Sequence, residues 1–296
     1  MVKLLECVPN YSEGRDLGKV EKIVDCFRGK AGVKLLDYSS DKDHNRTVVT
    51  VIGEIEPLKA AVTESVGRAL ELIDMTKHEG QHPRMGAVDV IPFIPVKNAS
   101  AEDADAAAKA VAAAAYEKYG QPFFLYEQSA SAPHRANLAD VRKGQFEGMA
   151  EKMKDPLWKP DFGETIHPTG GVTAIGARPP LVAFNVNLAT DNIEIAKNIV
   201  KAVRYINGGF RYCKAMPVAL EERGIVQVSM NLTDFTKTAI YRVFEAIRTE
   251  AKRYGVNVIG SEVVGLVPMQ ALVDCAEYYL QLENFSVEQV LESRLI

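Results

Sequence analysis

Short apolar runs alternate with amphipathic stretches through the first half of the chain. Lys3 to Val8 is an apolar run stopped by Pro9-Asn10, and Leu17 to Phe27 places its apolar residues at helical spacing. These patterns predict a strand that enters a loop, followed by a helix. The alternation continues with strands predicted at 33–38, 47–52, 87–96 and 123–126 and with helices predicted at 58–73 and 101–119.

Proline and glycine refine the ends of these elements. Pro57 suits the first turn of the helix at 58–73, and Gly120 ends the alanine-rich helix at 101–119. Pro92 and Pro95 interrupt the strand predicted at 87–96. Because proline cannot donate a ladder hydrogen bond, this strand is expected at a sheet edge or at a β-bulge.

The stretch from Ser129 to Arg178 is rich in glycine and proline and poor in long apolar runs. Such a segment is typical of a linker or of a loop that covers a ligand. After it the alternation resumes with strands predicted at 181–188, 225–232 and 256–267, helices at 193–205 and 239–254, and a last helix opened by Pro268.

Each half therefore follows a strand–helix–strand–strand–helix–strand order. This order is typical of the ferredoxin-like, or split βαβ, arrangement. We predict an α/β (α+β) protein with two such subdomains, residues 1–178 and 179–296. Ligand sites favour the junctions between domains, so a cleft or tunnel between the subdomains is the expected site.

Composition narrows the class of protein. The 296 residues carry a formal net charge of −4, with 47% hydrophobic and 25% charged residues. No global basic field points to nucleic acid or to an anionic membrane. No apolar run is long enough for a membrane span or a signal peptide, so we expect a soluble, cytoplasmic protein. The cysteines form no CxxC pair, which favours reduced thiols over disulfides or a zinc site: Cys7, Cys26, Cys213 and Cys275.

The segment richest in chemistry is His78-Glu79-Gly80-Gln81-His82-Pro83-Arg84-Met85-Gly86. Its first five residues match HExxH, a motif that binds zinc through two histidines on one helix face. Gly80 lies inside the motif, and Pro83 pushes the preceding His82 away from helical geometry. We therefore expect no metal here. Two interpretations remain: ordinary loop histidines, or a turn that presents an imidazole and the Arg84 guanidinium to a ligand.

Two blocks, Glu6 to Gly14 and Asp74 to Val96, closely resemble the hallmarks of the formiminotransferase family. Further blocks look familiar in the same order: Asn45-Arg46-Thr47, Pro160-Asp161-Phe162-Gly163, Gly176-Ala177-Arg178, Ala183 to Leu188 and Val264 to Pro268. The resemblance covers nearly the whole chain. Bifunctional members continue into a cyclodeaminase domain, whereas this sequence stops at Ile296 and looks like the stand-alone transferase.

The resemblance implies transfer of the formimino group of N-formimino-L-glutamate to N5 of tetrahydrofolate, in histidine degradation. Tetrahydrofolate would be a co-substrate, and no GxGxxG or P-loop pattern indicates a nucleotide. The family's catalytic acid/base is the histidine of His-Pro-Arg-Met-Gly, which here is His82. A histidine can serve both proton transfers because it titrates near neutrality. The resemblance and the proline-containing edge strand also suggest a homodimer.

The carboxylates of the donor and of the folate tail need cationic partners. Arg46 and Arg84 are the first candidates, and Arg178 is the third, because a guanidinium fork matches a carboxylate. A carboxylate could stabilise the cationic tetrahedral state, and Asp37 and Asp89 are available for this. Either aspartate could instead cap a turn or pair with an arginine.

The pterin offers hydrogen-bond donors and acceptors, which amide side chains match: Asn10, Asn45, Asn185 and Asn187. The family's folate-binding stretch follows its Asp-Phe-Gly. Here this stretch is Gly163, Glu164, Thr165, Ile166, His167, Pro168, Thr169, Gly170, Gly171 and Val172. Residues 167–171 differ from the family's usual ones, so the expected contacts come from the backbone.

Three alternatives stay open at this point. A related folate enzyme would use a formyl donor or 5-formyltetrahydrofolate at the same site. A folate-binding protein without catalysis would keep the fold, although the His82-Pro83-Arg84 block argues against it. A metal hydrolase is the third alternative, and metal analysis of the purified protein would exclude it.

Overall fold

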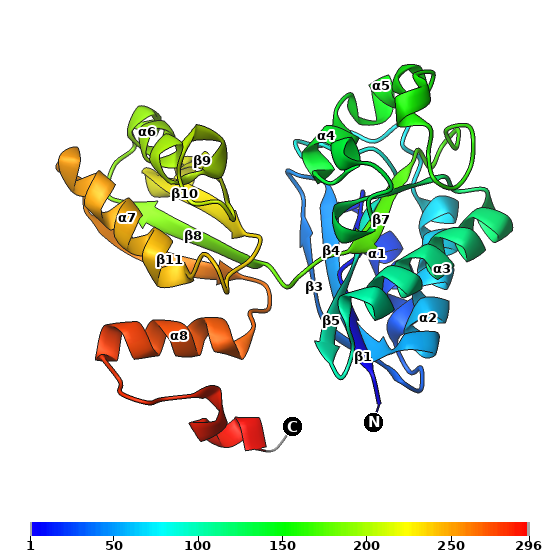
Figure 1. Cartoon of the computed structure of the whole chain (residues 1–296). Coiled ribbons are helices and arrows are strands. Elements are labelled where there is room, and N and C mark those ends of the chain that lie inside the picture. Colours follow the sequence, from blue (N-terminus) through cyan, green and yellow to red (C-terminus); the bar gives the residue numbers. More distant parts are fainter. Residues whose placement is uncertain (1, 295–296) are drawn as a thin grey trace. The chain divides into compact units, whose positions relative to one another are not determined.

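The computed structural model describes residues 2–294 and consists of two compact units, the first ending at Arg178 and the second beginning at Pro179 (Figure 1). Each unit has its own sheet and its own buried apolar cluster. The predicted mixed α/β chain with two subdomains is confirmed.

The first unit is built on a mixed sheet. Its strands are β1 (Leu4–Cys7), β2 (Asn10–Tyr11), β3 (Val33–Asp41), β4 (Arg46–Glu54), β5 (Val88–Lys97), β6 (Phe123–Leu125) and β7 (Thr173–Ala177). β1 and β2 lie between β4 and β5 and are antiparallel to both, and β3 pairs with the other side of β4. With β1 and β2 taken as one interrupted strand, this is the split βαβ order. β7 and β6 then extend the sheet beyond β5 in parallel.

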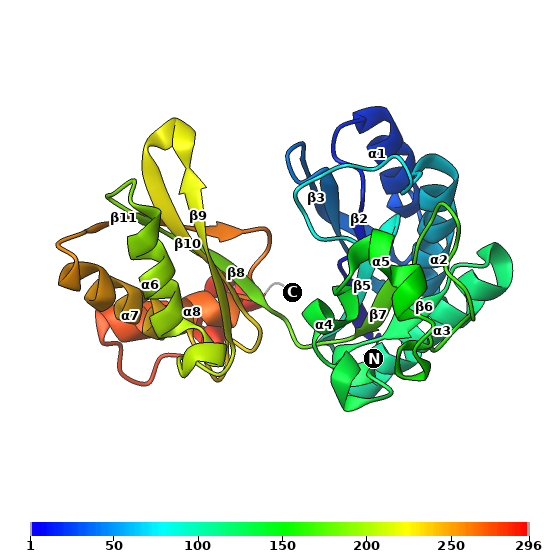
Figure 2. The same cartoon turned by 90° about the horizontal axis from the view of Figure 1, so that it is seen from above.

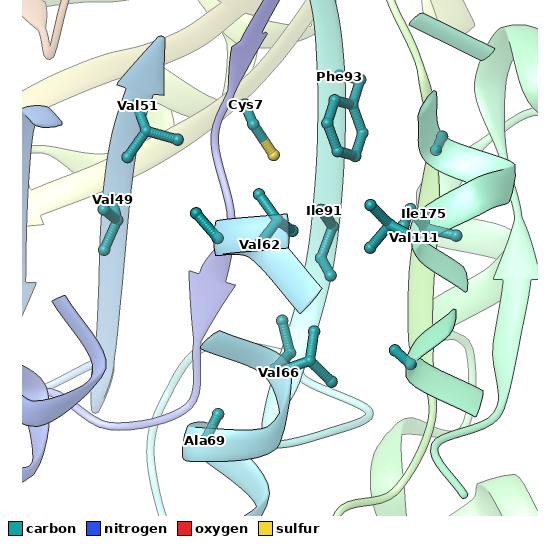
Figure 3. Close-up of a cluster of buried hydrophobic side chains, with 14 of the residues drawn as sticks. Cys7, Val49, Val51, Val62, Val66, Ala69, Ile91, Phe93, Val111 and Ile175 are labelled. Carbon is teal, nitrogen blue, oxygen red and sulfur yellow. The ribbon is translucent and has the colours of Figure 1, made fainter. Parts of the chain in front are cut away.

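Helices cover both faces of this sheet. They are α1 (Leu17–Val24), α2 (Ile55–Leu72), α3 (Ala101–Tyr119), α4 (Leu138–Arg142) and α5 (Gln145–Lys152). Helices α1 to α3 bury the main core, part of which Figure 3 shows: Cys7, Val49, Val51, Val62, Val66, Ala69, Ile91, Phe93, Val111 and Ile175. Helices α4 and α5 contribute to a smaller cluster with Phe124 and Ala174. Neighbouring strand residues face opposite sides, so this cluster lies on the other face.

Local sequence signals explain where the longer helices begin and end. The Asp16 side chain accepts hydrogen bonds from the backbone of Gly18 and Lys19 at the start of α1. Ser100 and Asp103 form a capping box at the start of α3, and Gly120 ends that helix with a left-handed φ of 69°.

Strand β5 lies inside the sheet, so the expected sheet edge is wrong and the expected bulge is found. Pro95 pairs with Leu5 on one side, and Pro92 pairs with Gly176 on the other. The register shifts in the pairing of β5 with β1 and again with β2. Proline keeps its carbonyl acceptor, and Val8 N donates to Pro92 O over 3.1 Å.

The stretch 129–178 is more structured than its composition indicates. It contains α4, α5 and the fully buried strand β7 between β5 and β6. It also contains the short 3₁₀ turns η3 (Pro133–Arg135) and η4 (Pro156–Trp158), and η2 (Glu127–Ser129) ends at its first residue. The prediction of a linker or covering loop therefore missed a central strand of five mostly small residues.

The second unit is a four-stranded antiparallel sheet with helices on one face. Its strands follow the order β11-β8-β10-β9, as a split βαβ fold requires. They are β8 (Val182–Leu188), β9 (Cys213–Leu220), β10 (Ile225–Leu232) and β11 (Val258–Val264). Helices α6 (Ile193–Val203) and α7 (Ile240–Arg253) cover it, and α8 (Met269–Leu280) follows (Figure 2).

The sequence pattern of the second unit explains most of this fold. Val182, Phe184, Val186 and Leu188 alternate along β8 and belong to the buried cluster with α6 and α7. Strand β9 carries Pro217 and pairs only with β10 in the described part of the chain, which is the edge position that proline tolerates. None of the helices within residues 2–294 has the length and apolar character needed to cross a membrane.

Candidate functional site

The segment between α2 and β5 carries the two histidines of the HExxH lookalike, and it forms no helix. The imidazoles of His78 and His82 face different partners. His78 contacts Asn45 and Arg84, whereas His82 contacts Arg46. The geometry that a shared metal ion requires is therefore not the geometry of this turn.

His82 is partly buried, and its Nε2 atom lies 2.9 Å from Nη1 of Arg46. A guanidinium only donates, so Nε2 holds the lone pair and the proton resides on Nδ1. Burial, followed by the charges of Arg46 and Arg142, lowers the pKa of His82 to about 2. The imidazole is therefore neutral near pH 7 and keeps its lone pair, and with Arg46 facing Nε2 it is a weaker base than the near-neutral titration expected from the sequence.

Arg46 opens β4 and has neutral partners. Its Nη1 donates to His82 and, over 3.4 Å, to Oδ1 of Asn10. Among residues 2–294 no carboxylate lies within ion-pair distance of it. Burial and the neighbouring Arg142 lower the pKa of the Arg46 guanidinium. A partly buried cation without a counterion is electrostatically suited to an anionic ligand.

Asn45 ties three parts of the sequence together. Its Oδ1 accepts from Gly14 N over 2.9 Å, and its Nδ2 donates to Glu79 O over 2.9 Å. Gly80 follows Glu79 and packs so closely on the loop before β4 that an added Cβ would lie 2.4 Å from His44 O. The Gly80 position therefore requires glycine, and Asn45 is a buried structural link beside Arg46.

Arg84 is buried and makes a complete set of hydrogen bonds. Nε donates to His78 Nδ1 over 3.1 Å, and Nη1 donates to Gln145 Oε1 over 3.0 Å. Both terminal nitrogens bind the Glu147 carboxylate, over 3.0 and 2.6 Å. Because His78 Nδ1 accepts, its Nε2 carries the proton and donates to Asn45 O over 3.0 Å. This set of contacts, which we call the Arg84 clamp, joins the histidine segment to α5.

Asp89 is 1% exposed and pairs with an arginine, which is one of the alternatives left open for it. Its Oδ1 accepts from Met85 N over 3.0 Å, and its Oδ2 accepts from Nη2 of Arg142 at the end of α4. Asp37 lies exposed on β3 opposite Thr50. The structure thus joins Asp89, and not Asp37, to the surroundings of His82 through Arg142.

The expected folate stretch, residues 163–172, packs directly on the histidine segment. Gly86 forms a bridge with Gly171, Ala87 N donates to Gly170 O over 2.9 Å, and Val172 N donates to Met85 O over 3.0 Å. Within the stretch, His167 Nδ1 accepts from Gly170 N over 2.8 Å. The backbones of two segments that are far apart in sequence therefore hydrogen-bond directly to each other.

The remaining candidates lie elsewhere. Arg178 ends the first unit, where its backbone N donates to Phe93 O over 3.0 Å. Asn185 and Asn187 belong to β8 of the second unit and join a polar network on its sheet. There Glu262 Oε1 accepts from Asn185 over 3.0 Å and from Gln227 over 2.7 Å, and Asn187 Oδ1 accepts from Gln227 over 2.9 Å.

Sequence reasoning missed Arg142, Gln145 and Glu147. All three lie in the stretch that was interpreted as a linker or loop. Arg142 is 53 residues from Asp89, and Glu147 is 63 residues from Arg84. The usable signal was the pair of helical turns at 138–152, since polar residues on helices that cover a sheet can reach the strand ends beneath them.

A neutral imidazole beside an arginine without a carboxylate partner is an arrangement that suits acid–base chemistry on an anionic small molecule. The chain belongs to the formiminotransferase family. Residues 4–178 match the description "Formiminotransferase domain, N-terminal subdomain", and residues 183–296 match "Formiminotransferase domain". The predicted membership is thereby confirmed.

Individual relatives agree with this assignment. The chain is 54% identical to the glutamate formimidoyltransferase of Streptococcus pyogenes serotype M1, with 100% of both chains covered. It is 44% identical to the glutamate formimidoyltransferase of Thermoplasma acidophilum, covering 99% of this chain and 98% of that one. It is 40% identical to the formimidoyltransferase-cyclodeaminase of Mus musculus, covering 100% of this chain and 56% of that protein. The expectation of a transferase is confirmed with the family.

Proposed function

We propose that this chain is a glutamate formimidoyltransferase, which moves the formimino group of N-formimino-L-glutamate to N5 of tetrahydrofolate. The full-length identity to two proteins of that name supports the proposal. The structural observation that carries it is the neutral His82 imidazole, whose Nε2 lone pair faces the Arg46 guanidinium.

The reaction needs one proton to move between two nitrogens. N5 of tetrahydrofolate attacks the formimino carbon, and the new N–C bond forms as the N5 proton passes to His82. The bond between that carbon and the glutamate nitrogen then breaks, and the imidazolium returns the proton to the leaving nitrogen. A neutral histidine is the required starting form, and such acid–base help is worth roughly 10²–10⁴ in rate.

We assign the other residues of the first unit to binding and positioning. Arg46 and Asn10 bind the donor, and Asn45 holds the loop that presents Arg46. Arg84 positions the histidine segment through its clamp, because its donors already have protein partners. Asp89 orients Arg142. The exposed Asp37 stays a candidate for the cationic tetrahedral state.

Tetrahydrofolate is proposed as the co-substrate, with no metal and no nucleotide. The backbone of residues 163–172, with Arg178 as a candidate for the glutamate tail, is our proposed folate-binding stretch. Its direct packing on Met85 to Ala87 supports this, since it places the stretch next to the segment that carries His82. We assign residues 1–178 and 179–296 as the N-terminal and C-terminal subdomains of the transferase.

The test of the function is turnover with two donors. N-formiminoglutamate and N-formylglutamate are each supplied with tetrahydrofolate, and the 5-substituted folate product is followed by absorbance and mass. We expect 5-formiminotetrahydrofolate and glutamate from the first donor. Product only from the formyl donor would favour the related formyl enzyme, and folate binding without product from either would favour a binding protein.

A cytoplasmic homodimer is the proposed state in the cell. The reduced cysteines and the ordinary composition support the location, and the family resemblance supports the dimer. The edge-strand argument for a dimer no longer applies, because β5 is an internal strand. Sedimentation equilibrium of the purified chain tests the dimer.

A further inference from the structure

The two arginines with the largest influence on His82 come from different elements. Arg46 comes from the start of β4 and touches the imidazole directly. Arg142 comes from the end of α4 and acts on both His82 and Arg46 through its charge. Arg142 gives one terminal nitrogen to Asp89, and its Nε is buried without a hydrogen-bond partner among residues 2–294. A buried guanidinium donor without an acceptor is uncommon and costly.

The charges around His82 do not balance. Arg46 and Arg142 supply two cations, and Asp89 is the buried carboxylate among them. The other acid that acts on Arg46 is Asp41, which is exposed and binds the His44 ring over 2.9 Å. The Arg84 clamp needs no further counterion, because the Glu147 carboxylate balances the charge of Arg84. One positive charge therefore stays uncompensated, and it fits one carboxylate.

We propose that Arg46 and Arg142 together form a subsite for the α-carboxylate of the donor, and that filling it draws Arg46 away from Nε2 of His82. This inference rests on the proposed function. It adds Arg142 to the residues proposed to bind the donor, and it makes donor binding free the Nε2 lone pair of His82 from Arg46.

The chemistry of the ligands selects the donor as the source of this carboxylate. In N-formiminoglutamate the α-carboxylate is three bonds from the formimino carbon, so it must lie close to the histidine that serves that carbon. The carboxylates of folate are separated from N5 by the whole aminobenzoyl group. A carboxylate subsite adjacent to His82 therefore suits the donor and not the folate tail.

The coupling follows from the hydrogen bonds. Without donor, Arg46 donates to Nε2 and occupies the lone pair that must take up the proton. A carboxylate is a stronger acceptor for a guanidinium than a neutral imidazole, so Arg46 turns to it. The lone pair is then free, and the base is exposed only when there is a donor to transfer.

Calorimetry on the full chain tests the subsite with L-glutamate and with isoglutamine, which has an amide in place of the α-carboxylate. We expect isoglutamine to bind roughly 10- to 100-fold more weakly. Arg142→Gln should remove most of this difference, whereas Arg68→Gln, which changes an exposed arginine of α2, should keep it. Equal affinities in the unsubstituted chain overturn the subsite even if Arg142→Gln fails to fold.

Two further measurements separate the remaining outcomes. In nitrogen NMR of the ring, saturating glutamate should move the Nε2 resonance of His82 and isoglutamine should not. An unmoved resonance overturns the release of Arg46. If Arg142→Gln weakens tetrahydrofolate binding but not tetrahydropteroate binding, the carboxylate comes from the folate tail and the donor subsite is wrong. Absence of any transfer in the unsubstituted chain contradicts the proposed function instead.

Discussion

Two arginines contact histidines of the same segment and have opposite surroundings. Arg84 is buried and completes its hydrogen bonds with His78, Gln145 and the Glu147 carboxylate. Arg46, at the start of β4, donates to the neutral atoms of Asn10 and His82 and has no carboxylate partner within residues 2–294. The Arg84 clamp is thus electrically neutral, whereas the pair of Arg46 and Arg142 is not.

The presence or absence of a counterion distinguishes an arginine that stabilises the fold from one that is suited to bind a ligand. A buried charge with a bonded counterion holds the chain in place, and removing one partner leaves the other exposed to a large desolvation cost. A buried charge without a counterion is costly in the free protein and is stabilised when an anion arrives. The family-like blocks of the sequence contain one arginine of each kind, Arg84 in the histidine segment and Arg46 at the start of β4, and only the surrounding fold distinguishes them.

The largest expected effect is the loss of the base. His82→Ala should lower turnover with N-formiminoglutamate by roughly 10²–10⁴, while tetrahydrofolate binding persists. Steady-state kinetics and folate titration measure the two effects. His134→Ala is the matched control, because His134 binds Leu157 O near Trp158 and makes no contact with Arg46 or Arg84. Unchanged turnover in His82→Ala would contradict the assignment.

The second-largest effect is expected at Arg46, the arginine without a counterion. Arg46→Gln should lower kcat/KM for the donor by roughly 10- to 100-fold, because a charge-assisted hydrogen bond is lost. It should also raise the pKa of His82, since the Arg46 charge is the largest lowering influence after burial. NMR titration of the His82 ring measures this shift. A ring that still titrates as in the unsubstituted chain would show that Arg46 does not hold it neutral.

Substitutions in the Arg84 clamp should change the stability of the chain more than its affinity for the donor. Arg84→Gln breaks the clamp and should cost about 1–3 kcal/mol of unfolding free energy, because the half-buried His78 ring loses its donor together with the bonds to Gln145 and Glu147. Urea unfolding measures this, and KM for the donor should change little. Glu147→Gln should also lower stability, because it leaves the buried Arg84 guanidinium without its counterion. A large rise in KM with unchanged stability would instead make Arg84 a donor ligand.

The smallest expected effect is on the pH dependence of stability. The pKa of His82 is lowered in the folded chain, so the unfolded chain binds the extra proton first. Stability should therefore be full above the ordinary pKa of histidine and should decline as the pH falls below it. Unfolding curves between pH 7 and pH 5 should show a shallower decline for His82→Ala. Equal slopes in the two proteins would contradict the neutral, buried imidazole.

Much of the fold could be predicted from periodicity, and the failures have physical causes. The helix at 101–119 was predicted to its observed ends because apolar spacing, the Ser100 capping box and Gly120 agree, and the helix at 58–73 was predicted from apolar spacing and begins three residues earlier, at Ile55. Strand β7 was missed because five mostly small residues carry no strand signal. Strand β5 was placed at an edge because periodicity does not show that register shifts accommodate its prolines.

The site was predictable only as far as it is local. Gly80 and Pro83 predicted that His82 lies outside a helix, and the choice of His82 as the acid/base came from the family resemblance. The partners that separate Arg84 from Arg46 lie on α4 and α5, more than fifty residues away, in a stretch with little periodicity. Long-range ion pairs leave no periodic trace, so charge compensation could be determined only from the fold.

The bridge between Gly86 and Gly171 has a consequence for directed evolution of this enzyme. A side chain at Gly86 would lie 2.2 Å from Val172 O, and one at Gly171 would lie 2.2 Å from Met85 O. Saturation libraries should therefore leave both positions fixed. Diversity introduced at residues 164–169 then probes the proposed folate-binding stretch while both glycines of the bridge stay in place.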